Sequence, residues 1–152
     1  MKKFSFIILS FLMMIVGVNS IKAADVVDDD VMSFFTATNP EDIRAITWRK
    51  LKTTDNQVVY CRDVERDWPT GSDGVNYSDE IDPMDSGLIY ILENGYPNKT
   101  IVDGGDKDRY ITQGAIWLYV TQSSTFENHF SDPEGLLPKM QELASAARAS
   151  DV

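Results

Sequence analysis

Residues 111–117 read Ile-Thr-Gln-Gly-Ala-Ile-Trp, and the second half of the chain is organised around this stretch. Thr112 is a good helix cap, and apolar side chains recur at helical spacing after it, which predicts a helix from Gln113 to about Gln122. The stretch is also rich in β-branched and aromatic residues, so a strand is a competing prediction. If the helix forms, Gln113 lies one residue after its cap, where free backbone N–H groups and the helix dipole would favour negative charge.

A helix is also predicted on the N-terminal side of this stretch. Residues 86–94 carry apolar side chains at helical spacing. Asp85 or Ser86 would cap the helix, and Gly95 followed by Pro97 would end it.

On the C-terminal side, a last helix is expected from Pro133 to about Arg148, supported by its alanine-rich composition. Its apolar stripe would be Leu137, Met140 and Leu143. Phe126 and Phe130 are four residues apart, which indicates a helical pair. The polar stretches 65–86 and 98–109 are predicted to be loops, the first with one short strand.

The first half of the chain predicts strands. Residues 46–53 and 57–61 are rich in β-branched and aromatic side chains, and the turn-forming residues 54–56 lie between them, so residues 46–64 are expected to form a hairpin. Cys61 would then share a face with Val59. Strands come first and helices later, which is typical of an α+β fold.

The N-terminus has the features of a secretory signal and is set apart from the fold. It begins Met-Lys-Lys, continues as a mostly apolar run over residues 4–18, and reaches small residues at 23 and 24. The apolar run is shorter than the roughly 20 residues of a membrane-spanning helix. We therefore predict a signal peptide over 1–23, an N-terminal lead-in over 24–45 whose acidic start is frayed, and one domain over 46–148.

The charge balance excludes some classes of partner. The chain has 14 Lys+Arg against 24 Asp+Glu, a net charge of −10. Removal of residues 1–23 takes away Lys2, Lys3 and Lys22, which leaves 11 bases against 24 acids and a net charge of −13. This charge argues against non-specific binding to nucleic acid and against adsorption to an anionic membrane. No segment after the signal is expected to insert into a membrane.

Cys61 is the only cysteine among 152 residues, so a disulfide within the chain is excluded by the count. A lone cysteine in a secreted domain must be buried, paired with another molecule, or held in special chemistry. The ordinary interpretation is a small buried hydrophobe, as in a noncovalent binding module. A dyad with His129, the only histidine, would instead make a cysteine protease or transpeptidase.

Three segments, taken in order, are similar to a known family. They are Val-Tyr-Cys-Arg-Asp at 59–63, Asn-Gly-Tyr-Pro at 94–97 and Ile-Thr-Gln-Gly-Ala-Ile-Trp at 111–117. Over roughly residues 46–143 the sequence resembles the bacterial thioester domains of Gram-positive surface adhesins, and residues 112–117 are the most specific piece. Arg62 departs from the family, which often has an aliphatic residue after the cysteine.

The resemblance implies an internal crosslink between Cys61 and Gln113. The thiol of Cys61 attacks the side-chain amide carbon of Gln113, ammonia leaves, and a thioester remains. In the family, a lysine amine on a host protein then attacks the same carbonyl, and an isopeptide bond joins the bacterium to the host. The chain would be a secreted or cell-surface adhesin domain that reacts once, not an enzyme, and it would use no cofactor and no metal.

The resemblance also implies a fold and a set of supporting residues. The fold is a β-rich lobe, with the N-terminal hairpin in a small sandwich or barrel, packed against a C-terminal helical lobe. The supporting residues are Tyr60, Thr112, Ala115 and Trp117. Gly114, next to Gln113, would let another backbone or an amine approach closely.

General chemistry agrees with this interpretation. A thiolate is a strong nucleophile and a good leaving group, whereas an amide is a poor electrophile, so the fold must hold both groups at near-attack distance. Apolar neighbours would keep water from hydrolysing the bond. A noncovalent module with an inert Cys61 and a hydrolase that uses Cys61 and His129 remain open alternatives.

Acidic residues cluster in two places, at 63–85 and at 103–108. Neither cluster has the ligand spacing of an EF-hand calcium loop. We expect both to be solvated acidic surfaces. Their charge would steer a lysine-bearing target towards the domain through long-range attraction.

Overall fold

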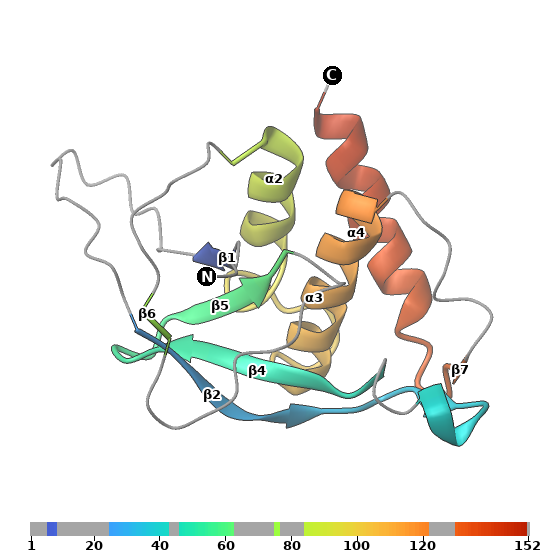
Figure 1. The fold of residues 1–152 in the computed structure, drawn as a ribbon. Coiled ribbons are helices and arrows are strands. Elements are labelled where there is room, and N and C mark those ends of the chain that lie inside the picture. The colour runs from blue at the N-terminus through green and yellow to red at the C-terminus, as the bar shows by residue number, and fades with distance from the viewer. Residues whose placement is uncertain are drawn as a thin grey trace, which may run out of the picture. The chain divides into compact units, whose positions relative to one another are not determined.

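The computed structural model describes residues 6–8, 25–42, 46–62, 75–76, 84–121 and 130–151. The fold is α+β, as predicted: small antiparallel sheets come first and three packed helices follow (Figure 1). The chain divides into two compact units, residues 1–30 with 49–83 and residues 31–48 with 84–152. Most of the predicted signal peptide, most of the predicted loop 65–86, and His129 lie outside the described residues.

The first unit is built on a five-stranded sheet with the strand order β1-β5-β4-β2-β6. The strands are β1 (Phe6–Ile8), β2 (Asp25–Met32), β4 (Trp48–Thr53), β5 (Val58–Cys61) and β6 (Val75–Asn76). The pairings of β1 with β5, β4 with β5 and β2 with β6 are antiparallel. Cys61 therefore ends a strand that has a neighbour on each side.

The predicted hairpin is confirmed in β4 and β5, where Leu51 pairs with Val59. Both side chains are buried, as the alternation of apolar residues requires. The turn is closed by the hydroxyl of Thr53, which accepts a bond from the backbone N–H of Gln57 at 2.9 Å. Asn56 takes a left-handed conformation with a φ of 67°, which asparagine tolerates better than most residues.

The acidic start of the lead-in is a strand, so the prediction that it is frayed is wrong. β2 lies between β4 and β6 in the sheet. Val26 and Met32 anchor it because both are buried. The charge of Asp28 is balanced by Arg49, whose guanidinium lies 2.7 Å from the carboxylate, and ladder pairing outweighs the low strand propensity of aspartate.

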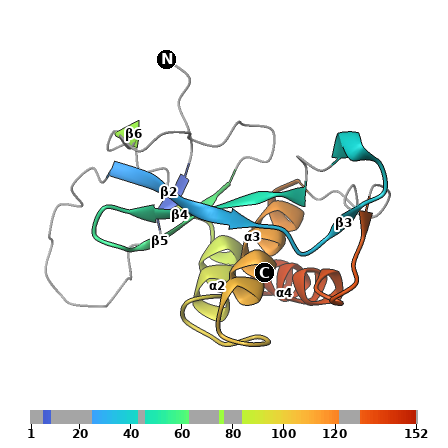
Figure 2. The same ribbon diagram turned by 90° about the horizontal axis from the view of Figure 1, so that it is seen from below.

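The second unit holds the three helices, α2 (Ser86–Asn94), α3 (Asp106–Thr121) and α4 (Leu137–Ser150). Each helix contacts the other two, and Figures 1 and 2 show them side by side. α2 has the predicted bounds, and its predicted cap is confirmed because the Asp85 carboxylate accepts the backbone N–H of Leu88 at 2.8 Å. A short 3-10 helix at Pro40–Asp42 and the strand pair β3 (Thr36–Ala37) and β7 (Phe130–Ser131) complete the unit.

The start of α3 differs from the prediction. The helix begins at Asp106, so residues 106–109 of the predicted loop are helical, and the alternative that 111–117 form a strand is excluded. Thr112 is therefore an interior residue rather than the cap. The helix extends further because Asp108 takes up the backbone N–H groups of the preceding loop, a role that residue type alone did not indicate.

α4 also starts later than predicted. Gly135 has a φ of 68°, which lies outside the helical region, so the helix cannot include it. The carboxylate of Asp132 accepts the backbone N–H groups of Leu136 and Leu137 at 2.9 and 2.8 Å. The buried stripe of the helix is Met140, Ala144 and Ala147, rather than the predicted set with Leu137 and Leu143.

Phe130 lies in a strand, so the predicted helical pair with Phe126 is wrong at this residue. Phe130 pairs with Ala37 across β3 and β7, and its ring stacks on Phe35 with centroids 4.2 Å apart. Tertiary packing against an aromatic side chain thus overrides the spacing pattern. Phe126 lies outside the described residues.

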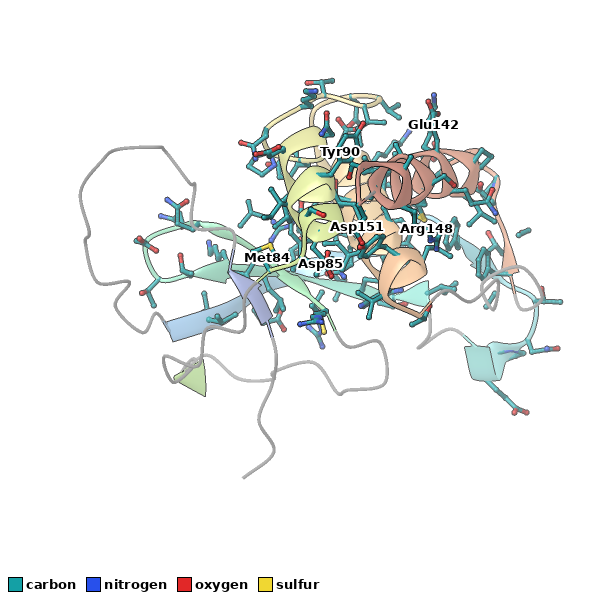
Figure 3. The ribbon with its side chains drawn as sticks, turned by 90° about the horizontal axis from the view of Figure 1, so that it is seen from above. Met84, Asp85, Tyr90, Glu142, Arg148 and Asp151 are labelled. Carbon is teal, nitrogen blue, oxygen red and sulfur yellow. The ribbon has the colours of Figure 1, made fainter. Side chains whose placement is uncertain are left out.

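The end of α4 is tied to the other two helices by Asp151. Its carboxylate accepts bonds from the hydroxyls of Ser86 and Tyr119. Figure 3 shows Asp151 at the end of α4 and Asp85 at the start of α2 on the same side of the helices. Partial burial, together with hydrogen bonds to Asp151 and Asp85, raises the pKa of Tyr119 to about 12.

Candidate functional site

Helix α3 is the central element of the second unit. Every residue from Asp108 to Leu118 is buried. A helix that is buried on all sides packs against neighbours in every direction, so the position of each of its side chains is set by contacts. Thr112, Gln113, Ala115 and Trp117, four of the residues singled out in the sequence, lie on this buried stretch.

The carboxylate of Asp108 organises the loop that leads into α3. It accepts backbone N–H groups from Ile101, Val102 and Gly104 at 2.7–2.8 Å, and a longer bond from Asp103 at 3.3 Å. Burial alone would raise the pKa of this carboxyl, but the four backbone N–H bonds outweigh it and hold the pKa below its ordinary value of 3.8. The prediction of a solvated surface at 103–108 is therefore wrong for Asp108, which is fully buried.

Thr112 joins α3 to the segment that follows α2. Its hydroxyl donates to the backbone carbonyl of Asp108 at 2.8 Å and accepts the backbone N–H of Tyr96 at 2.9 Å. A Cβ at Gly95 would lie 2.6 Å from the Thr112 side chain, so only glycine allows this approach. The Asn-Gly-Tyr-Pro segment and the Thr-Gln segment, far apart in the sequence, are thus in direct contact.

Gln113 follows Thr112 on the face of α3 that carries the aromatic residues. Tyr110 is three residues before it and Trp117 four residues after it, which places all three on one face of the helix. Trp48 stacks on Tyr110 with ring centroids 3.7 Å apart and contacts Trp117 edge to face at 4.8 Å. The Gln113 side chain is 2% exposed, so its carboxamide lies in a region that excludes bulk water.

The predicted surroundings of Gln113 need two corrections. Gln113 lies inside α3, where its backbone N–H belongs to the helix, so the expected free N–H groups of a first turn are not at this position. Gly114 does not open a path for an amine, because the Met140 side chain of α4 fills that space. A Cβ at Gly114 would lie 2.3 Å from the Met140 sulfur, so this glycine serves helix packing.

Cys61 and Tyr60 lie in the first unit, at the end of β5. Both side chains are buried, Cys61 at 4% exposure and Tyr60 at 1%. On the outer side of β5, Cys61 pairs with Phe6 of β1 and Tyr60 pairs with Ile7. The position of Cys61 at the strand end is therefore set by its pairing with β1, and β5 pairs with β4 two residues earlier, at Val59.

Sequence reasoning missed Asp108, which no motif marks. Its partners are backbone N–H groups, which every residue type except proline carries, so they leave no signature in the sequence. The glycines and asparagine of residues 98–105 indicated a turn but not the side chain that closes it. Among the described residues no cluster of histidine, cysteine or acidic side chains is arranged to hold a metal ion. Across the same ranges, no helix has the length and hydropathy needed to cross a membrane.

Comparisons with known proteins place this arrangement in a family. A family model described as the thioester domain matches residues 58–149. Among solved structures, the Bacillus anthracis TIE protein is similar with a TM-score of 0.64 and 19% sequence identity, over 83% of this chain and 24% of that chain. At this identity the likeness bears on the fold alone, and the chain spans about a quarter of that protein's length. No curated protein matches the chain.

The span matched by the family model covers well over half of the chain. It contains all three segments on which the resemblance rests, the Tyr-Cys strand end, the Asn-Gly-Tyr-Pro segment and the Thr-Gln helix. The chain therefore belongs to the thioester domain family.

Proposed function

We propose that the chain carries an internal thioester between the sulfur of Cys61 and the side-chain carbonyl carbon of Gln113. The Cys61 sulfur attacks that carbon, a carbon–sulfur bond forms, the carbon–nitrogen bond of the amide breaks, and ammonia leaves. The observation that carries the proposal is the family match over 58–149, which includes both residues. The burial of both side chains supports it, because a thioester survives only where water is excluded.

The stored bond would react with a primary amine. A lysine Nζ attacks the carbonyl carbon of Gln113, the Cys61 thiolate leaves, and an isopeptide bond remains. Because the product is stable, each molecule reacts once, and the protein is a self-reacting adhesin domain rather than a catalyst. The host protein that supplies the lysine, secretion, and a place at the cell surface are part of this proposal.

Two parts of the structure support the roles proposed for the reacting and supporting residues. Tyr110 and Trp117 lie on one face of α3 with Gln113 between them in the sequence, and Trp48 contacts both aromatic rings. Tyr60 and Cys61 are consecutive buried residues at the end of β5. Thr112 holds α3 against the segment after α2, so it would act on Gln113 by positioning the helix.

Amine uptake tests the function. The purified chain is incubated with methylamine and, separately, with a lysine-rich soluble protein, and adducts are located by mass spectrometry. We expect methylamine to be incorporated at Gln113 together with a newly reactive thiol at Cys61, and the lysine-rich protein to form a covalent adduct that resists denaturant. Cys61→Ala and Gln113→Ala should abolish both products, whereas Gln141→Ala, at an exposed glutamine of α4, should not.

The same experiment separates the alternatives. A noncovalent binding module would give no adduct with either amine. A protease or transpeptidase with a Cys61–His129 dyad would lose its reaction in His129→Ala, whereas thioester chemistry needs no histidine and should proceed at an unchanged rate in that variant.

A further inference from the structure

Strand β5, which ends in Cys61, is paired on its outer edge with β1. β1 belongs to the predicted signal peptide, which we expect to be cleaved from the secreted chain. β1 pairs antiparallel with β5 and forms the edge of the sheet, with Phe6 opposite Cys61, Ile7 opposite Tyr60 and Ile8 opposite Val59. These three residues lie inside the predicted signal peptide 1–23. The chain before processing and the chain after processing therefore present different surfaces at Cys61.

Removal of the signal makes β5 the edge of the sheet. Among the strands of the described residues, the order β1-β5-β4-β2-β6 leaves β5 paired only with β4 once β1 is gone. An edge strand offers a row of backbone N–H and C=O groups that a further strand can pair with. β1 shows that a strand fits at this edge in an antiparallel orientation and in a defined register.

We propose that this edge is where the partner binds, and that the partner supplies an extended, lysine-bearing segment that adds to β5 as an antiparallel strand. The inference rests on the proposed thioester and names the class of partner that reaches it. Strand addition is a recurring mode of peptide recognition, in which backbone bonds give affinity and alternate side chains give specificity.

The register of the β1–β5 pair predicts where the lysine lies along the partner segment. Residues directly opposite each other in an antiparallel pair project to the same face, with Cβ atoms about 4.5–5.5 Å apart. A lysine at the place of Phe6, opposite Cys61, therefore projects to the face on which the Cys61 sulfur lies. A lysine one residue later, at the place of Ile7, projects to the other face, because side chains alternate along a strand.

Two properties of the chain favour such a partner. The processed chain has a net charge of −13, which attracts a cationic segment over long range. The segment now seated on the edge, Phe6–Ile8, consists of an aromatic and two β-branched residues, the types that favour a strand. The partner segment is accordingly expected to have apolar, strand-forming residues on either side of its lysine.

The test uses the secreted chain and peptides copied from the strand that the structure seats on β5. The probes are acetylated and amidated peptides of residues 4–10 with a single lysine, introduced as Phe6→Lys or Ile7→Lys. A third peptide carries the Phe6→Lys change and N-methylated backbone amides, which cannot donate to the ladder. Methylamine is the control for the thioester itself, and hydrogen exchange of the amides of residues 58–61 reports occupation of the edge.

We expect the Phe6→Lys peptide to be joined to Gln113 at least about tenfold faster than the Ile7→Lys peptide. The N-methylated peptide should lose that advantage, and methylamine should be incorporated at Gln113 of the secreted chain in the absence of any peptide. The Phe6→Lys peptide should also slow exchange at 58–61 in Cys61→Ala, which has no thioester, so occupation of the edge is measured even if the chemistry is absent.

Three results would overturn the inference. The first is equal rates for the two lysine positions. The second is exchange at 58–61 that the peptide does not change. The third is a secreted chain whose mass shows that residues 6–8 are retained, since the edge would then stay occupied. Absence of a methylamine adduct, by contrast, counts against the thioester and not against strand addition.

Discussion

Asp108 and Thr112 show how single residues define the surroundings of Gln113. The Asp108 carboxylate gathers the backbone N–H groups of the loop before α3, and its own carbonyl accepts the Thr112 hydroxyl. Thr112 in turn holds the backbone of Tyr96. Gln113 is therefore preceded by a residue that is bonded on two sides, which fixes the rotation of the helix at this point.

Removal of the Thr112 hydroxyl tests this arrangement. Thr112→Val keeps the shape of the side chain but leaves the backbone N–H of Tyr96 without its acceptor, which should lower the free energy of unfolding by about 1–2 kcal/mol. Thr112→Ser keeps the hydroxyl and should lose less than half of that amount. Urea denaturation measures both. A loss in Thr112→Ser as large as the loss in Thr112→Val would contradict the role given to the hydroxyl bond, because serine keeps that bond and lacks only the methyl group.

The lowered pKa of Asp108 predicts that the fold loses stability in acid. Because its pKa in the fold lies below the ordinary value of 3.8, the unfolded chain binds a proton first as the pH falls. The stabilisation is complete above about pH 4 and declines as the pH drops through the folded pKa. Asp108→Asn should lower stability at pH 7 by about 2 kcal/mol or more, because charge-assisted bonds are lost.

The prediction is checked by measuring the free energy of unfolding of the native chain and of Asp108→Asn from pH 7 to pH 3. The quantity of interest is the difference between the two proteins at each pH. This difference should shrink as the pH falls, since the Asp108 carboxyl of the unfolded chain takes up a proton before that of the folded chain, whereas asparagine does not titrate. A difference that stays constant over the range would contradict the role assigned to the charge.

At the scale of elements, the three helices could be predicted from the sequence. Their first and last residues could be predicted only in part. α2 matched its prediction because both of its signals are local, a capping Asp85 and a terminating Gly95. α3 and α4 did not, because their starts depend on the side chains of Asp108 and Asp132 bonding to backbone groups several residues away. Such bonds are visible only after the chain has folded.

The contact of α3 with α4 depends on a glycine. A Cβ at Gly114 would overlap the Met140 side chain, so Gly114→Ala should destabilise the fold by about 1–3 kcal/mol. In a Met140→Ala background the overlap is gone, and the same substitution should be neutral or should stabilise by up to about 1 kcal/mol through helix propensity. A double-mutant cycle by urea denaturation measures the coupling. Additive effects would show that the two side chains do not compete for space.

At the scale of the whole molecule, the order of strands and helices was enough to predict an α+β fold. The lead-in was mispredicted because three consecutive aspartates disfavour a strand locally, whereas ion pairing of Asp28 with Arg49 and burial of Val26 favour it in the sheet. The candidate site was predictable to the extent that its residues form motifs. The backbone contacts that support it had no counterpart in the sequence pattern.

The central claim is that one sulfur and one carboxamide carbon condense within the folded chain. The most direct measurement is the intact mass of the native protein in denaturant without reducing agent, beside Cys61→Ala and Gln113→Ala. The account predicts that the native chain is lighter than its sequence by one ammonia and that each variant has its full calculated mass. A native chain at full mass, with a Cys61 thiol that reacts with alkylating reagents once unfolded, would contradict it.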